Sequence, residues 1–147
     1  MEVQSVCIFF QTTISLGPYK RGFHLITDVI TKEINNSINK ISVGLVNIFL
    51  KHTSASLTIN ENFDSSVRDD MENISNKLVP DGTSYIHSYE GKDDMPAHFK
   101  SSMFGASLTI PIVKGELGLG TWQGIYLNEH RDSARKRKII ITIQGQK

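Results

Sequence analysis

The sequence predicts one α+β domain in which antiparallel, sandwich-like β-sheets are combined with two main helices and one short helix. A chain of 147 residues, 39% of them hydrophobic, has the length and composition of a single domain with one core. Two segments show helical spacing of apolar residues, and strand-like runs follow one another near the C-terminus. Consecutive strands favour antiparallel pairing over a doubly wound parallel sheet. We therefore treat residues 1–147 as one domain.

The first predicted strand covers residues 3–12, which are rich in β-branched and aromatic side chains. It contains Cys7, the only cysteine of the chain, within an apolar run. A lone cysteine cannot form an internal disulfide, so we expect Cys7 to be a small buried hydrophobic residue. The Gly17-Pro18 pair then marks a turn.

Three helices are predicted from apolar periodicity and from residues that favour helix ends. The first covers residues 27–39, and the second begins at Asp64 or Ser65 and ends near Leu78. The apolar stripe of the second helix is Val67, Met71, Ile74 and Leu78. A short third helix has Pro96 in its first turn and ends near Gly105.

The remaining strands are predicted from runs of β-branched and aromatic residues. Residues 42–51 are almost continuously apolar, so we expect this strand to be buried on both faces. Short strands are predicted at about 55–60 and, inside the loop 83–95, around Tyr85–Ser88. The last three strands cover about 106–113, 121–128 and 138–144, with a glycine-marked hairpin between the first two.

The overall charge and the chain ends argue against several classes of partner. Sixteen basic and fifteen acidic residues give a net charge of +1, which does not favour nucleic acid or an anionic membrane. No apolar run approaches the roughly 20 residues of a membrane span. The N-terminus carries Glu2 and no basic region, unlike a signal peptide. We expect a cytosolic protein that binds neither nucleic acid nor membrane.

Four polar positions are not needed by the fold and are candidates for function. Asp70 lies near the apolar stripe of the second helix, where a carboxylate must find a partner, reach solvent or point into a site. His52 directly follows the long strand, whose end holds side chains in a fixed place. His87 and His98 belong to a twelve-residue segment with three acidic residues, which is either a solvated loop or part of a site.

Three histidines match the number of nitrogen ligands that a catalytic zinc ion usually has. His98 also opens a helix, where the helix dipole favours a neutral, metal-binding imidazole. The sequence does not show whether His52, His87 and His98 converge. The alternative is three unrelated polar histidines.

Two further segments could bind an anion. Gly118–Gln123 could present backbone N–H groups, although a tight hairpin with Trp122 in the core explains the same residues. A basic stretch between the last two strands has the chemistry of a phosphate clamp, but it could also be a solvated turn. Its members are Arg131, Arg135, Lys136, Arg137 and Lys138.

Taken together, these motifs resemble the YjbQ family, the secondary thiamine-phosphate synthase type. The matching segments are Lys51–Leu57, Asn60–Asn62, Asp70, His87, Gly91–His98, Gly120–Gln123 and Glu129 with the basic turn. The resemblance implies a sandwich-like α+β fold and a homotrimer. It also implies weak thiamine-phosphate synthase activity, which joins hydroxymethylpyrimidine diphosphate to thiazole phosphate and releases pyrophosphate.

The resemblance places the polar cluster of the family at His52, Ser54, Asp70, His87, Asp94 and His98. From the residues themselves we expect His52, His87 and His98 as metal ligands and Asp70, Ser54, Asp94 and Glu61 as catalytic residues. The expected substrate-binding or phosphate-binding residues are Thr121, Gln123, Arg131 and Arg137. This chain departs from the family pattern in having Asp94 where many members have Asn, and in lacking Gly-Pro in the basic turn, which leaves the choice of Arg137 open.

Two kinds of metal ion are expected for different reasons. A diphosphate substrate normally arrives with Mg²⁺, which prefers oxygen ligands. A histidine cluster favours zinc or another transition metal. We therefore expect a resident metal at the histidines and Mg²⁺ brought by the substrate. The alternative functions are a metal-dependent hydrolase of a small phosphorylated metabolite, with Asp70 or Glu61 as base, and a non-catalytic trimeric small-molecule-binding protein.

Overall fold

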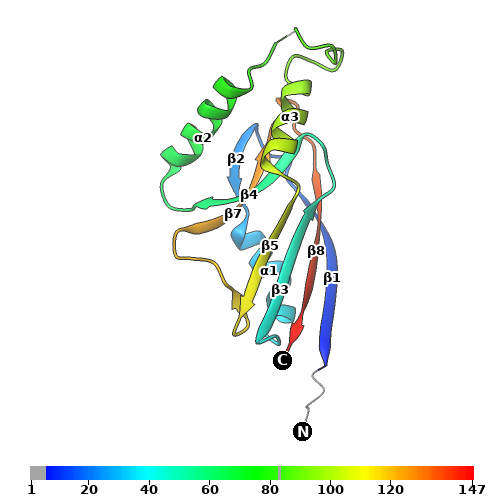
Figure 1. Ribbon diagram of the computed structural model, residues 1–147, viewed down its shortest axis with the longest axis vertical. Helices are drawn as coiled ribbons and strands as arrows, with labels where there is room; N and C mark the ends of the chain where they lie inside the picture. Colours follow the sequence, from blue (N-terminus) through cyan, green and yellow to red (C-terminus); the bar gives the residue numbers. More distant parts are fainter. Residues whose placement is uncertain (1–5, 83) are drawn as a thin grey trace.

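The computed structural model describes residues 6–82 and 84–147, which form two antiparallel sheets and three helices (Figure 1). The five-stranded sheet has the order β1-β8-β3-β5-β6, and the three-stranded sheet has the order β2-β7-β4. The strands are β1 Cys7–Leu16, β2 Gly22–Leu25, β3 Val43–Leu50, β4 Ala55–Glu61, β5 Ser107–Val113, β6 Glu116–Leu117, β7 Gln123–Glu129 and β8 Arg137–Gln146. The helices are α1 Thr27–Ile38, α2 Ser65–Leu78 and α3 Asp94–Phe104. This architecture confirms the predicted α+β class.

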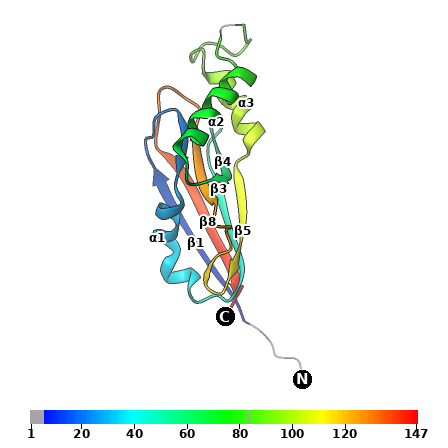
Figure 2. The same ribbon diagram turned by 90° about the vertical axis from the view of Figure 1, so that its left-hand side faces the viewer.

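One apolar core joins the two sheets and α1. The inward residues of the large sheet meet Ile125 and Leu127 of β7 and the buried isoleucines of α1. Helix α1 therefore lies against one side of the strands (Figure 2). Because side chains alternate along a strand, Tyr126 and Asn128 of β7 are on the opposite face of the small sheet. Helices α2 and α3 contact that small sheet through β2 and β4.

The outer face of the large sheet is open, which contradicts the expectation that residues 42–51 are buried on both sides. In β3, Val46, Ile48 and Leu50 are buried, whereas Leu45 and Phe49 are 41% and 46% exposed. The physical reason is that antiparallel sheets can pack on one face only. None of the described helices covers the other face of this sheet.

Some predictions about buried residues and about short strands were also wrong. Cys7 is exposed, because it lies at the outer end of β1 rather than over the core. The four-residue β2 was not predicted, and the strand expected at Tyr85–Ser88 is absent, because residues 85–87 are bends. In α2, Ile74 and Leu78 are exposed although they belong to the expected buried stripe.

The ends of several strands meet at α3. Strand β3 ends at Leu50, β4 begins at Ala55 opposite Glu129 of β7, and β8 begins at Arg137. Helix α3 lies beside these strand ends (Figure 1) and its Ser101 hydroxyl donates to the Ala55 carbonyl at 2.7 Å. Among the described helices, none is long and apolar enough to cross a membrane.

Candidate functional site

A polar cleft of about 590 Å³ opens where these strand ends meet the start of α3. Its wall combines histidines, hydroxyl groups, carboxylates and three arginines. The lining residues are His52, Thr53, Ser54, Glu90, Asp94, His98, Arg131, Ser133, Arg135 and Arg137. The cleft is large enough for a small metabolite.

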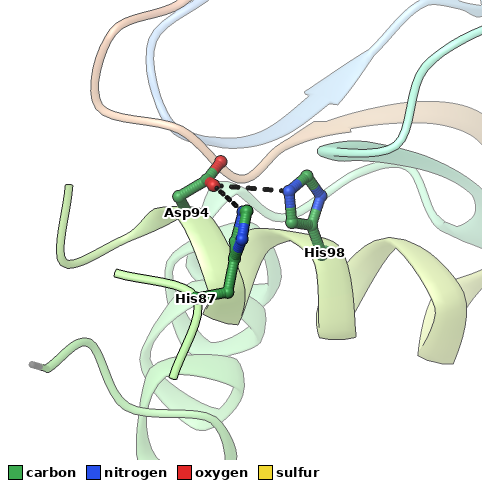
Figure 3. A group of neighbouring side chains, drawn as sticks. All are labelled: His87, Asp94 and His98. Carbon is green, nitrogen blue, oxygen red and sulfur yellow. Dashed lines mark hydrogen bonds and ion pairs between the residues drawn. The ribbon is translucent and has the colours of Figure 1, made fainter. Parts of the chain in front are cut away.

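His87, Asp94 and His98 converge beside this cleft (Figure 3). Asp94 and His98 are one turn apart on α3 and therefore share a face of the helix, while His87 comes from the preceding loop. The Asp94 Oδ2 atom is 2.8 Å from His87 Nε2 and 3.4 Å from His98 Nε2. The Asp94 side chain is only 1% exposed, so it needs these partners.

The hydrogen bond made by Nδ1 determines which tautomer the neutral ring of His98 adopts. His98 Nδ1 is 2.7 Å from the carbonyl oxygen of Thr53, which can only accept a hydrogen bond. Nδ1 must therefore carry a proton, and in the neutral ring Nε2 is an acceptor. Two electron-rich atoms, His98 Nε2 and Asp94 Oδ2, then face each other. This contact is favourable only if a proton or a metal ion lies between them.

The geometry of the group fits a divalent ion. The candidate ligand atoms of the three residues all lie within 4.8 Å of one another. Ligand atoms around a tetrahedral zinc ion are about 3.3 Å apart, given bonds of about 2.0–2.1 Å, so small side-chain rotations suffice. Two imidazoles and one carboxylate suit zinc or a similar transition metal. The Thr53 carbonyl supplies the outer hydrogen bond that usually orients a ligating histidine.

Arg131 holds the carboxylates behind this group. Its guanidinium donates to Asp94 Oδ1 and, over 3.2 Å, to Asp93 Oδ2. Burial alone would raise the pKa of Asp93, but the backbone N–H of Asp132 and the charge of Arg131 outweigh it and lower that pKa. Arg131 is thereby committed to two carboxylates, and it leaves the Oδ2 atom of Asp94 turned toward the histidines.

Arg137 is also occupied. It forms a two-pronged ion pair with Glu129, with Nε–Oε1 and Nη2–Oε2 distances of 2.7 and 2.5 Å. Arg137 is 5% exposed and Glu129 is fully buried. A guanidinium in this position first neutralises a buried carboxylate. The sequence suggested no role for Glu129. The signal that could have found it is its position at the end of an apolar strand, because a carboxylate buried there needs a charged partner.

His52 lines the cleft, but the structure does not bring it into the His87, Asp94 and His98 group. Its Nε2 atom accepts the backbone N–H of Lys138 at 2.8 Å. Burial, followed by the charge of Arg137, lowers the pKa of His52. The neutral ring therefore carries its proton on Nδ1 and acts as a donor. The third member of the group is Asp94 and not His52, which was expected there as a metal ligand. Asp94 itself was expected to be a catalytic residue.

The other candidate residues are divided between the cleft and distant places. Ser54 lines the cleft. The side chain of Asp70 is exposed on α2 and makes no hydrogen bond or ion pair to the described residues. Glu61 accepts the backbone N–H groups of Phe63 and Asp64 at the start of α2.

Thr121 and Gln123 lie at the opposite end of the small sheet from the cleft. Gln123 pairs with Glu61, six positions along the ladder from the Ala55–Glu129 pair, which corresponds to about 20 Å. The Gln123 side chain accepts the Gly120 N–H at 2.7 Å and closes the hairpin. Trp122 is 61% exposed and contacts the ring of Phe63, so its expected place in the core was wrong.

Comparison with known proteins identifies the family. The family model described as UPF0047 protein YjbQ-like matches residues 12–146. This chain belongs to the YjbQ family. The UPF0047 protein YjbQ of Salmonella typhimurium is 53% identical over 139 residues, which cover 95% of this chain and 100% of the relative. The corresponding protein of Escherichia coli O157:H7 is 50% identical over the same length and coverage.

Solved structures of YjbQ-like proteins share the fold. A Clostridium acetobutylicum protein of the YjbQ/UPF0047 family is 36% identical, with a TM-score of 0.77 over 91% of this chain and 98% of its own. A YbjQ-like protein of unknown function from Sulfolobus solfataricus P2 has a TM-score of 0.86 at 24% identity, and covers 96% of this chain and 100% of its own. The likeness to the Sulfolobus protein concerns the fold alone.

Proposed function

We propose that this YjbQ-family protein binds a divalent transition-metal ion, such as zinc, at His87, Asp94 and His98, and acts on a phosphorylated small molecule in the adjoining cleft. The observation that supports this most is the hydrogen bond from His98 Nδ1 to Thr53, which leaves His98 Nε2 as an acceptor facing the Asp94 carboxylate. The reaction proposed is of the thiamine-phosphate synthase type, and a cytosolic location is part of the same proposal.

In that reaction the carbon–oxygen bond between the pyrimidinyl methylene and the diphosphate breaks. The thiazole nitrogen forms a new bond to the same carbon, and pyrophosphate leaves with the electron pair. A bound divalent ion, or Mg²⁺ arriving with the diphosphate, would supply positive charge near the leaving group. Stabilising that departing charge is the main task of the protein.

The residues of the chain contribute binding and orientation. Arg131 fixes the Asp94 carboxylate, and Thr53 fixes the His98 ring, so both groups are positioned before a ligand arrives. The Nδ1–H of His52 and the hydroxyl of Ser54 are donors on the wall of the cleft. Pre-positioned donors stabilise developing negative charge without having to reorganise during the reaction.

A product assay combined with metal analysis tests this proposal. Purified protein should contain or take up one divalent metal ion per chain, and with both substrates and Mg²⁺ it should form thiamine phosphate and release pyrophosphate in equal amounts. Release of inorganic phosphate from a single substrate would indicate the hydrolase. Metal binding without turnover would indicate the binding protein, and a chain that binds no metal would contradict the metal site itself.

We also propose that the protein is a homotrimer. The outer face of the large sheet exposes apolar side chains that a water-soluble monomer would rarely leave together. They are Phe9, Val43, Leu45, Phe49 and Val113. Sedimentation at micromolar concentration should give three times the mass of one chain, and substitution of Leu45 by Asp should shift it toward the monomer. A monomeric wild-type protein would contradict the trimer.

A further inference from the structure

Three arginines line the cleft, and they differ in what they contact. Arg131 is held by Asp93, Asp94 and the Glu90 carbonyl. Arg137 is held by the buried Glu129. Arg135 is exposed, and it has no hydrogen bond or ion pair among the described residues. Only the guanidinium of Arg135 is therefore available to a ligand without leaving a buried carboxylate unpaired.

The other free donors of the cleft lie on its wall together with Arg135. His52 has its Nε2 atom engaged by the Lys138 backbone N–H, so its Nδ1–H is the remaining donor of the neutral ring. The hydroxyl groups of Thr53, Ser54 and Ser133 make no hydrogen bond to the described residues. A guanidinium, an imidazole N–H and three hydroxyls offer more donors than the two oxygens of a carboxylate can use.

We propose that Arg135 is the residue that binds the phosphoryl group of the ligand, at a subsite of the cleft separate from the His87, Asp94 and His98 group. The inference rests on the proposed function for the class of ligand, a phosphate ester or diphosphate. The planar guanidinium can donate two parallel hydrogen bonds to phosphate oxygens, and the surrounding hydroxyls can donate to the third. Arg131 and Arg137, which the sequence suggested for this role, position Asp94 and neutralise Glu129 instead.

With this subsite, the ligand would be held at two points in the cleft. Its phosphoryl end is held by Arg135, and another oxygen or nitrogen atom reaches the metal group. Inorganic phosphate should therefore bind without a metal ion. Pyrophosphate, which has a second phosphoryl group, should bind more tightly when the metal ion is present.

The test measures binding of inorganic phosphate to the metal-free full-length protein by isothermal titration calorimetry. Substitution of Arg135 by Ala should weaken binding roughly tenfold or more, because a charge-assisted two-pronged contact is lost. Substitution by Lys should recover part of the affinity, since the charge remains but the fork is lost. Lys136→Ala is the matched control, because Lys136 is a neighbouring exposed cation that does not line the cleft, and it should leave the affinity within about twofold.

Three outcomes would overturn the assignment. They are no detectable phosphate binding to the wild-type protein, an unchanged affinity in Arg135→Ala, and an equal loss in Lys136→Ala. Acetate that binds as tightly as phosphate would contradict the phosphoryl class. Measurements with and without added zinc separate this inference from the proposed function, because the tighter binding of pyrophosphate should require the metal ion and the binding of inorganic phosphate should not. If no metal binds but phosphate binding still depends on Arg135, the subsite stands and the metal site fails.

Discussion

The two ends of the small sheet differ, although both carry polar residues that look alike in the sequence. At the cleft end, Glu129 and Arg137 form a buried ion pair, and Asp94 lies buried between two histidines. At the hairpin end, Phe63 and Trp122 are exposed, and the side chains of Glu61 and Gln123 accept hydrogen bonds from nearby backbone N–H groups. The same two strands, β4 and β7, supply both ends.

The difference comes from what meets the strands at each end. At the cleft end, α3 and the segment after β7 surround the strand ends and bury the side chains of Glu129, Arg137 and Asp94. Charges must then pair, and their interactions are stronger than in water. At the hairpin end the side chains stay hydrated and serve the local turn. Chemistry that needs fixed charges is therefore expected at the cleft end, and the following predictions test that contrast.

The largest effect is expected from breaking the buried ion pair. Arg137→Ala leaves the Glu129 carboxylate buried without a partner, so the free energy of unfolding should fall by about 3–5 kcal/mol. Urea unfolding measures it, with the exposed Arg135→Ala variant as control, which should change stability by less than about 0.5 kcal/mol. Equal stability of the two variants would contradict the contrast.

Removal of one candidate ligand should weaken metal binding next. His98→Ala deletes the Nε2 atom that faces Asp94, and we expect a loss of about 10–100-fold in zinc affinity, of the order seen when the surroundings of a metal site are disturbed. Competition with a chelator measures the affinity. His24→Ala is the control, because His24 stacks on Tyr19 and does not line the cleft. Full metal content in His98→Ala would exclude the site.

The cleft end should also make stability sensitive to acid. Burial, with the charges of Lys100, Arg21 and Arg137, lowers the pKa of His130 to about 3. The unfolded state takes up a proton near pH 6.5 and the folded state does not, so stability is lost as the pH falls from about 6.5 toward 3. At pH 5 this histidine should lower the free energy of unfolding by about 2 kcal/mol relative to pH 7.

The variant His130→Phe isolates this contribution. A phenyl ring can stack on Phe104 in place of the imidazole, although the hydrogen bond with Ser56 is lost. Unfolding free energies at pH 7 and pH 5 should therefore differ less in the variant than in the wild-type protein. An unchanged difference would show that His130 ionises normally in the folded state.

The smallest effect is expected at the hairpin end. Thr121 is exposed and lies about 20 Å along the ladder from the cleft. In a monomer, Thr121→Ala should therefore change phosphate affinity by less than about twofold. A large loss in the assembled protein, which disappears in the monomeric Leu45→Asp variant, would show that the hairpin of one copy completes the cleft of another. Calorimetry on both forms distinguishes these outcomes.

Local patterns in the sequence determined most of the secondary structure. Apolar spacing places α1 and α2 within one residue of their observed bounds, because a helix repeats every 3.6 residues and buries one face. Runs of β-branched residues likewise locate β3, β4, β5 and β8. The sequence singled out His87 and His98, and their side chains lie close together at the start of α3.

Long-range packing decided the rest. The short β2 exists because Gly22–Leu25 pairs with β7 more than 100 positions later, and four residues carry too little pattern to show this alone. Asp94 joins the two histidines, while His52 turns its Nε2 toward Lys138, and Arg137 is taken by Glu129. Each of these depends on which charged or polar atoms the fold brings within hydrogen-bonding distance, and neither the spacing nor the identity of the residues specifies that.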